Sequence, residues 1–210
     1  MTTIEGGRAP RLPREQRRQQ VLEAALEVFS SAGYHAASMD DIAERAGVSK
    51  PVLYQHFPGK LDLYLALLDA GIAELMDAGR AALTSTSDNR QRVSGVVNAY
   101  FAFVEDPRGA YRLVFESDLV NEAQVRARVD AADTALARQT ASVIAEDTGL
   151  SDDQAMLLAS GMQGLVQVAA RRWLHDEAGR VSREEAADLI TGLAWRGIRG
   201  FPLTHPPQET

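Results

Sequence analysis

The 210-residue chain contains no cysteine and no long uncharged apolar stretch. Without cysteine it cannot form disulfides, cysteine-ligated zinc sites or iron–sulfur clusters, and it has no catalytic thiol. A transmembrane helix would need about eighteen or more consecutive apolar residues, which the sequence lacks. The first 20 residues contain five arginines and no apolar run, unlike a signal peptide. We therefore expect a cytoplasmic protein.

Lysine is also scarce, since Lys50 and Lys60 are the only lysines among 22 basic residues. The net charge of −7 is unevenly distributed. Residues 1–60 hold eight Lys and Arg against seven Asp and Glu, whereas residues 61–210 hold fourteen against twenty-two. A neutral-to-basic first part on an acidic remainder is compatible with nucleic-acid binding by that first part alone.

The apolar spacing predicts helices throughout, and no strand-like alternation with hairpin turns appears. We expect an all-α fold of about nine helices, with capping boxes at Ser38–Asp41, Ser151–Gln154 and Ser182–Glu185. The predicted helices span about 14–33, 39–46, 50–56, 60–83, 89–105, 120–147, 152–175 and 183–198, and a short one follows the turn at Pro107 and Gly109 and ends at about 116. The predicted organisation is a flexible basic arm (1–13), a DNA-binding domain (14–60), a ligand-binding and dimerisation domain (61–200) and a tail (201–210).

Residues 40–57 have the spacing of a helix-turn-helix. A small residue, Ala43, precedes Gly47 by four positions, and Leu53 follows six positions later. Two short helices that cross steeply need a small residue at the crossing, and their turn needs a residue that tolerates positive φ. The second helix of such a motif lies in a DNA major groove. An ordinary corner between two helices is the alternative.

Polar residues of the second short helix favour DNA. Lys50 opens this helix and Lys60 opens the next, although a lysine at a helix N-terminus opposes the helix dipole. A nearby phosphate or base edge would make both positions favourable; otherwise they are two solvated lysines. Pro51 offers an apolar surface to a thymine methyl, and further polar groups come from Tyr54, Gln55 and His56.

The segment GYHAASMDDIAERAGVSKPVLYQHFPGK, residues 33–60, closely resembles the TetR family of bacterial transcription regulators, and the match extends back to Arg14. The resemblance implies a homodimer whose two heads enter successive major grooves of operator DNA. By position, the residues facing bases would be Lys50, Pro51, Tyr54 and Gln55. Those facing phosphates would be Ser38, Tyr54, His56 and Lys60. Val52 stands where the family usually has Thr, so one phosphate contact is lost.

Five arginines at the start of the chain extend this basic surface. They would reach the DNA backbone or an adjacent minor groove, or merely keep the arm in solution. These residues are Arg8, Arg11, Arg14, Arg17 and Arg18.

The segment 155–170 has Ser160, Gln163 and Gln167 as its only polar residues. A helix that is apolar nearly all round must be buried on more than one side. TetR-like proteins pair through their last two long helices, so we expect a dimer interface there. A core confined to one chain is the alternative.

Large apolar residues fill the middle helices, which indicates either a core or a hydrophobic pocket between helices. The strings at 38–57, 86–92 (TSDNRQR) and 111–120 (YRLVFESDLV) are similar to the actinobacterial TetR-family regulators of fatty acid biosynthesis. This resemblance implies a tunnel for a long-chain acyl-CoA effector that relieves DNA binding at fatty acid synthase genes. The expected wall residues are Leu75, Leu83, Tyr100, Phe101, Phe115 and Met162.

Other functions fit the sequence less well. The chain has no glycine-rich phosphate loop and no nucleophile elbow, and its four histidines lack metal-ligand spacing. We therefore expect no enzyme activity, no metal and no cofactor. One alternative is a TetR-type repressor of an efflux or catabolic gene that answers another hydrophobic compound. Another is a helical interaction protein that does not bind DNA.

Overall fold

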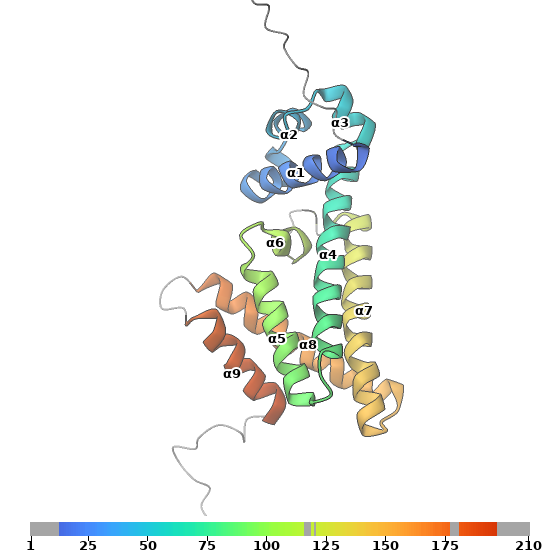
Figure 1. The fold of residues 1–210 in the computed structure, drawn as a ribbon, viewed down its shortest axis with the longest axis vertical. Coiled ribbons are helices and arrows are strands. Elements are labelled where there is room, and N and C mark those ends of the chain that lie inside the picture. The colour runs from blue at the N-terminus through green and yellow to red at the C-terminus, as the bar shows by residue number, and fades with distance from the viewer. Residues whose placement is uncertain (1–12, 116–118, 120, 177–180, 197–210) are drawn as a thin grey trace, which may run out of the picture. The chain divides into compact units, whose positions relative to one another are not determined.

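The computed structural model describes residues 13–115, 119, 121–176 and 181–196. Within these ranges all the regular structure is helical, which confirms the predicted all-α fold of nine helices (Figure 1). The predicted tail, and the predicted arm apart from Pro13, lie outside the described residues. The helices are α1 (Arg14–Ala36), α2 (Met39–Arg45), α3 (Lys50–His56), α4 (Lys60–Thr84), α5 (Asn89–Glu105), α6 (Ala110–Phe115), α7 (Ala123–Thr148), α8 (Asp152–His175) and α9 (Arg183–Arg196).

The chain divides into two compact units, Met1–Leu67 and Leu68–Thr210. We call them the first and the second unit. The division falls within α4, so this single helix contributes residues to both. No described helix has the length and apolarity that a bilayer crossing requires.

The first unit is built around the apolar face of α1. Val21, Ala25 and Phe29 are buried at the regular spacing seen in the sequence. Gly33 has φ of 77°, so the helical path kinks there and continues to Ala36 instead of ending at Gly33 as predicted. Only a residue without a side chain adopts this backbone conformation at little cost. The kink brings a new turn of helix to the end of α1.

Local signals also set the helix limits of the second unit. Ser151 and Gln154 form the predicted capping box of α8, and Ser182 Oγ accepts a hydrogen bond from Glu185 N at 3.1 Å. Gly149 ends α7 with φ of 70°. α7 begins at Ala123 and not near 120 as predicted, since Glu122 occupies the N-cap position.

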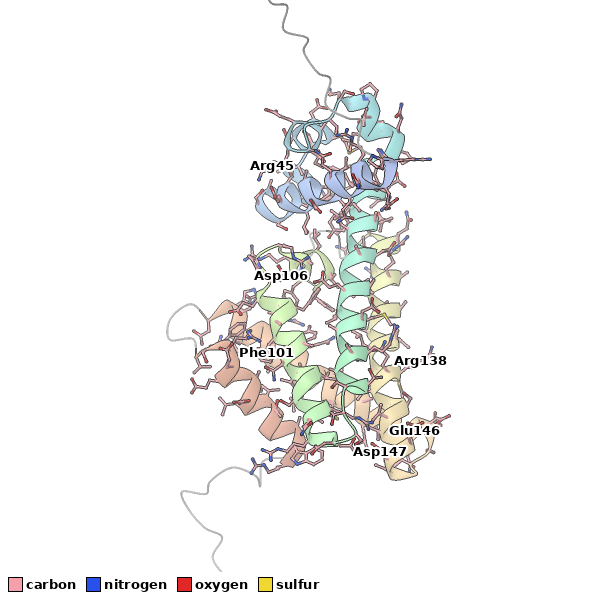
Figure 2. The ribbon with its side chains drawn as sticks, viewed as in Figure 1. Arg45, Phe101, Asp106, Arg138, Glu146 and Asp147 are labelled. Atoms are coloured by element: carbon pink, nitrogen blue, oxygen red, sulfur yellow. The ribbon has the colours of Figure 1, made fainter. Side chains whose placement is uncertain are left out.

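Close helix approaches shape the interior of the second unit. A Cβ added at Gly95 on α5 would lie 3.1 Å from Ala82 Cβ on α4, so the two helices nearly touch there. α5 also packs against α8 and α9, and α7 packs along α8. Phe101 lies on α5 (Figure 2), and its ring centroid is 5.5 Å from that of Trp173 on α8. α4, α5, α7, α8 and α9 therefore surround a common interior.

Candidate functional site

The turn between α2 and α3 has the predicted helix-turn-helix geometry. Gly47 has φ of 63°, and Val48 N donates to Ala43 O at 3.0 Å. Ala43 and Leu53 are buried, at 4% and 0% exposure, so the small residue and the inward leucine take their predicted places. Ser38 caps α2, with its Oγ accepting from Asp41 N at 3.1 Å.

The outer side of α3 carries the residues expected to meet bases. Lys50, Pro51 and Gln55 are exposed, and Tyr54 exposes 47% of its surface, much for a large aromatic side chain. His56, expected at a phosphate, is half-buried near the end of the same helix. The structure therefore gathers five of the seven predicted DNA-contacting residues on α3, and Ser38 and Lys60 flank the motif.

Lys50 has a partner that the sequence did not predict. Its Nζ lies 2.6 Å from Asp40 Oδ2 in the first turn of α2, and both side chains are exposed. The hydrogen bond and the charge of Asp40 raise the pKa of Lys50, so this ammonium is charged at neutral pH. The ion pair ties the first residue of α3 to the first turn of α2.

Lys60 is bound to backbone carbonyls. Its Nζ donates to Tyr34 O at 2.8 Å and to Ala37 O at 2.9 Å, and it lies 4.3 Å from the centroid of the Tyr34 ring. These carbonyls follow the kink in α1, where helix geometry leaves acceptors without backbone donors. Lys60 therefore stabilises the end of α1, whether or not it also meets a phosphate.

A hollow of about 360 Å³ lies beside α3 in the first unit. Arg14 and Arg17 of α1 line it together with Gln55 and His56 of α3. Arg17 donates to Gln20 Oε1 at 3.0 Å, while no described residue pairs with Arg14. Arg18 lies over the Phe57 ring, and Arg8 and Arg11 lie outside the described residues. Two of the five arginines thus extend the polar surface of α3.

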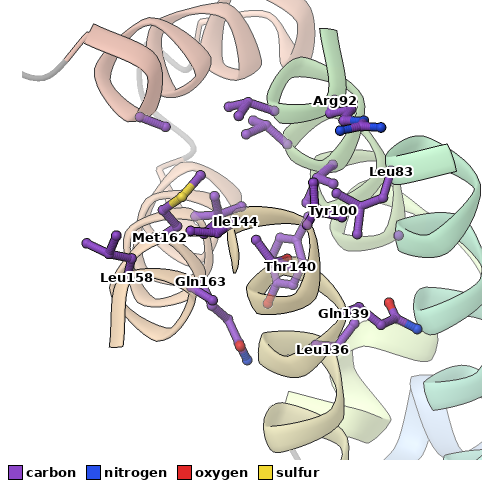
Figure 3. Close-up of a pocket in the computed structure, with 18 of the residues that line it drawn as sticks. Leu83, Arg92, Tyr100, Leu136, Gln139, Thr140, Ile144, Leu158, Met162 and Gln163 are labelled. Carbon is purple, nitrogen blue, oxygen red and sulfur yellow. The ribbon is translucent and has the colours of Figure 1, made fainter. Parts of the chain in front are cut away.

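The second unit contains a larger cavity of about 460 Å³, within the usual range for small-molecule sites. Figure 3 shows side chains from α4, α5, α7 and α8 that point into this shared space. Most of the wall is aliphatic. Its aliphatic members include Val93, Val96, Val97, Leu136, Val143 and Ile144.

Four of the six predicted ligand-binding residues line this cavity: Leu75, Leu83, Tyr100 and Met162. Phe101 is not among the lining residues, because it is fully buried against Trp173. Phe115 is not among them either, and its ring lies 6.2 Å from that of Tyr100. The two phenylalanines therefore pack behind the residues that line the cavity.

One polar region of the cavity wall joins α5 to α7. Arg92 Nη1 lies 3.1 Å from Asp147 Oδ2, near the C-terminal end of α7 (Figure 2). The same guanidinium donates to Asn89 Oδ1 at 2.9 Å and to Thr86 O at 2.7 Å. The positive charge of Arg92 is therefore already matched inside the protein.

A second polar region joins α7 to α8, and Gln139, Thr140 and Thr148 of α7 add further polar groups to the wall. Gln163 and Gln167 both line the cavity, and each donates from Nε2 to Asp133 Oδ1 at 2.9 Å. The sequence carried a signal for the two glutamines, which interrupt an otherwise apolar segment. It carried none for Asp133, which lies 30 residues from Gln163 along the chain.

α8 also presents an apolar stripe that no described residue covers. Leu157 and Val168 expose 75% and 63% of their surfaces. Gly161 and Gly164 lie between them in sequence, and a Cβ added at either would meet nothing within 4 Å. On α9, Leu189 and Trp195 are exposed as well. The last two long helices therefore carry exposed apolar residues, as a second subunit would require.

Comparison with known proteins agrees with these features. Residues 21–67 match the model of the "Bacterial regulatory proteins, tetR family". The chain is 46% identical to the HTH-type transcriptional activator FasR of Mycolicibacterium smegmatis, over 94% of this chain and 90% of that protein. It is also 30% identical to the crystal structure of a TetR-like transcriptional regulator from Rhodococcus sp. RHA1, which it matches with a TM-score of 0.69 over 91% of this chain and 100% of the other.

A more distant solved structure shares the fold alone. FadR of Bacillus subtilis, in complex with stearoyl-CoA, is 17% identical and matches with a TM-score of 0.71 over 86% of this chain and 98% of the other. The sequence relatives named here are transcriptional regulators and not enzymes. With its helix-turn-helix and its helical second unit, the chain belongs to the TetR family of bacterial transcriptional regulators.

Proposed function

We propose that the protein regulates fatty acid or lipid biosynthesis genes in the bacterial cytoplasm, and that a long-chain acyl-CoA in the cavity of the second unit controls its affinity for DNA. The observation that carries this proposal is the apolar cavity of about 460 Å³ among α4, α5, α7, α8 and α9, in a chain 46% identical to FasR. Stearoyl-CoA bound to FadR of Bacillus subtilis adds support, because the two proteins share a fold.

Residues 14–60 form the proposed DNA-binding domain. Lys50, Pro51, Tyr54 and Gln55 would face bases, because they stand on the exposed side of α3. Ser38, Tyr54, His56 and Lys60 would face phosphates. Arg14 and Arg17, beside the hollow that Gln55 and His56 also line, would add backbone contacts.

Residues 61–200 form the proposed ligand-binding and dimerisation domain. Two heads are needed to occupy two half-sites, and the exposed stripe on α8 with the exposed residues of α9 would supply the contact between subunits. Gly161 and Gly164 would let the two backbones approach closely. The contact would bury Leu157 and Val168, which are costly to leave in water.

Helix α4 provides the proposed link between ligand and DNA. Leu75, Gly79 and Leu83 line the cavity, while Lys60 at the start of the same helix holds carbonyls of the first unit. A ligand that binds one position of α4 more tightly than another shifts the population between the two. DNA affinity changes by the same coupling free energy.

The test is a fluorescence-anisotropy titration of the full chain on duplex DNA from the fatty acid synthase promoter of its source organism, with and without palmitoyl-CoA. Specific binding that palmitoyl-CoA weakens is the expected result. If palmitoyl-CoA leaves DNA binding unchanged, the proposal that it is the effector is wrong. The protein would then be a regulator that responds to another hydrophobic molecule, such as a repressor of an efflux or catabolic gene. If the protein does not bind this promoter specifically, the proposal that it regulates fatty acid synthase genes is wrong.

A further inference from the structure

We propose that Gln163, Gln167 and Asp133 make the cavity selective for apolar ligands that carry a neutral hydrogen-bond donor, an amide N–H or a hydroxyl, over ligands with a free carboxylate. This inference rests on the proposed function, because it takes the cavity of the second unit as the effector site. It assigns a chemical preference to that site which goes beyond its apolar character.

The orientation of the two glutamines follows from their shared partner. They stand four residues apart on α8, so they project from the same face of the helix. Each Nε2 lies 2.9 Å from Asp133 Oδ1. An ionised carboxylate only accepts hydrogen bonds, so the amide nitrogens must turn toward Asp133 and the carbonyl oxygens away from it. No described residue donates to either Oε1, so both remain acceptors for a ligand.

The charge around this cluster favours the same ligands. Asp133 forms no ion pair with any cation in the described part of the chain, so its negative charge is shared only with two neutral amides. Arg92, on the same cavity wall, is paired with Asp147. A ligand carboxylate beside the glutamines would lose its hydration and meet acceptor oxygens with a carboxylate behind them. A neutral donor would gain a hydrogen bond instead.

For lipids, this chemistry separates a free fatty acid from neutral derivatives of the same chain. A free fatty acid ends in a carboxylate, which is ionised at neutral pH. A fatty acyl-CoA has a neutral thioester in its place, followed by an arm with amide N–H groups, and a fatty alcohol has a hydroxyl. The cluster should therefore accept an amide N–H of the acyl-CoA arm or the hydroxyl of the alcohol and disfavour the acid.

Isothermal titration calorimetry of the full chain tests this with palmitoyl-CoA and palmitate, each below its micellar concentration, and with hexadecanol below its solubility limit. The wild type should bind palmitoyl-CoA and hexadecanol more tightly than palmitate. Asp133→Asn removes the charge and lets one amide turn an N–H toward the cavity, so it should tighten palmitate binding about tenfold, which corresponds to about 1.4 kcal/mol. A gain of affinity for one ligand is not a result that damage to the fold would produce.

Two further variants isolate the cause. Asp130→Asn removes the same charge from an exposed position three residues earlier on α7 and should leave the affinity for palmitate unchanged. Gln163→Leu removes one acceptor and should weaken the binding of hexadecanol or palmitoyl-CoA, whichever uses a donor there, without a gain for palmitate. Comparing the loss of affinity for hexadecanol with that for palmitoyl-CoA therefore shows whether a hydroxyl or an amide N–H donates to Gln163.

Several results would overturn the inference. One is wild-type affinity for palmitate equal to that for hexadecanol, and another is an equal gain in the Asp130 and Asp133 variants. If the cavity shows the predicted selectivity among the three ligands but palmitoyl-CoA does not change DNA binding, the proposed function is wrong and the inferred ligand preference stands. If the wild type binds none of the three ligands, both are wrong.

Discussion

Replacing Lys60 by alanine should lower the stability of the protein by about 2 kcal/mol. The ammonium donates to two carbonyls, at 2.8 and 2.9 Å, and lies 4.3 Å from the Tyr34 ring centroid. Hydrogen bonds to charged groups contribute roughly 1.5–3 kcal/mol each, and an exposed cation–π contact roughly 0.5–1 kcal/mol. Because Lys60 and Tyr34 are only half-buried, water screens and partly replaces these contacts, so the expected loss of about 2 kcal/mol is smaller than the sum of the separate contributions.

The other lysine is the matched control. Lys50 forms one ion pair with Asp40, and both side chains are exposed. Water screens exposed ion pairs, so Lys50→Ala should be close to neutral in stability. Each variant loses one positive charge from the proposed DNA surface, so both should weaken binding to a random-sequence duplex and make it less dependent on salt.

Urea unfolding followed by circular dichroism, at one fixed protein concentration because subunit association affects apparent stability, measures the difference. For a chain of this length a loss of about 2 kcal/mol also lowers the melting temperature by about 4–8 °C. Equal unfolding midpoints for the Lys50 and Lys60 variants would refute the stabilising role of the carbonyl contacts. Normal DNA affinity in both would refute the assignment of the lysines to the DNA surface.

Three other substitutions test the second unit. Leu83→Phe should narrow the cavity and reduce the response to palmitoyl-CoA in anisotropy titrations while DNA binding without ligand stays normal; an unchanged response would place the ligand elsewhere. Gly95→Val should cost about 1–3 kcal/mol in thermal unfolding, since its Cβ would lie 3.1 Å from Ala82 Cβ, and a wild-type melting temperature would contradict that close approach. Arg108 lowers the pKa of Asp106 through its hydrogen bonds. Because the folded pKa lies below the unfolded value of about 3.9, this stabilisation is present at neutral pH and is lost as the pH falls through the folded pKa. Arg108→Gln should therefore destabilise by up to about 1 kcal/mol at pH 7 and by less at pH 3; equal losses at both would argue against it.

The helix limits and the helix-turn-helix were predictable because their signals are local. The Ser38–Asp41 capping box and the turn glycine Gly47 act within a few residues of the backbone that they shape. Gly33 is a position at which such local signals do not decide the structure. The sequence marks it as a helix stop, but whether the chain leaves the helix or kinks and continues depends on the packing of the residues that follow.

The wall of the cavity was predictable only in part. Leu75, Leu83, Tyr100 and Met162 line it as expected. Phe101 was expected beside them, yet it is buried behind the wall. Apolar spacing tells which residues leave water, because burial of apolar area needs no particular partner. It does not tell which of them face a cavity and which face another helix.

Helix formation, the capped ends and the motif that places α3 depend on interactions among residues a few positions apart, so they can be read from the linear order of the chain. Polar partners depend on which helices pack together. Lys60 meets the carbonyl of Tyr34 26 residues away, and Arg92 meets Asp147 55 residues away. Hydrogen bonds are short and directional, so these pairs, and the chemistry of the cavity, are decided only when tertiary packing brings the groups within about 3 Å of each other.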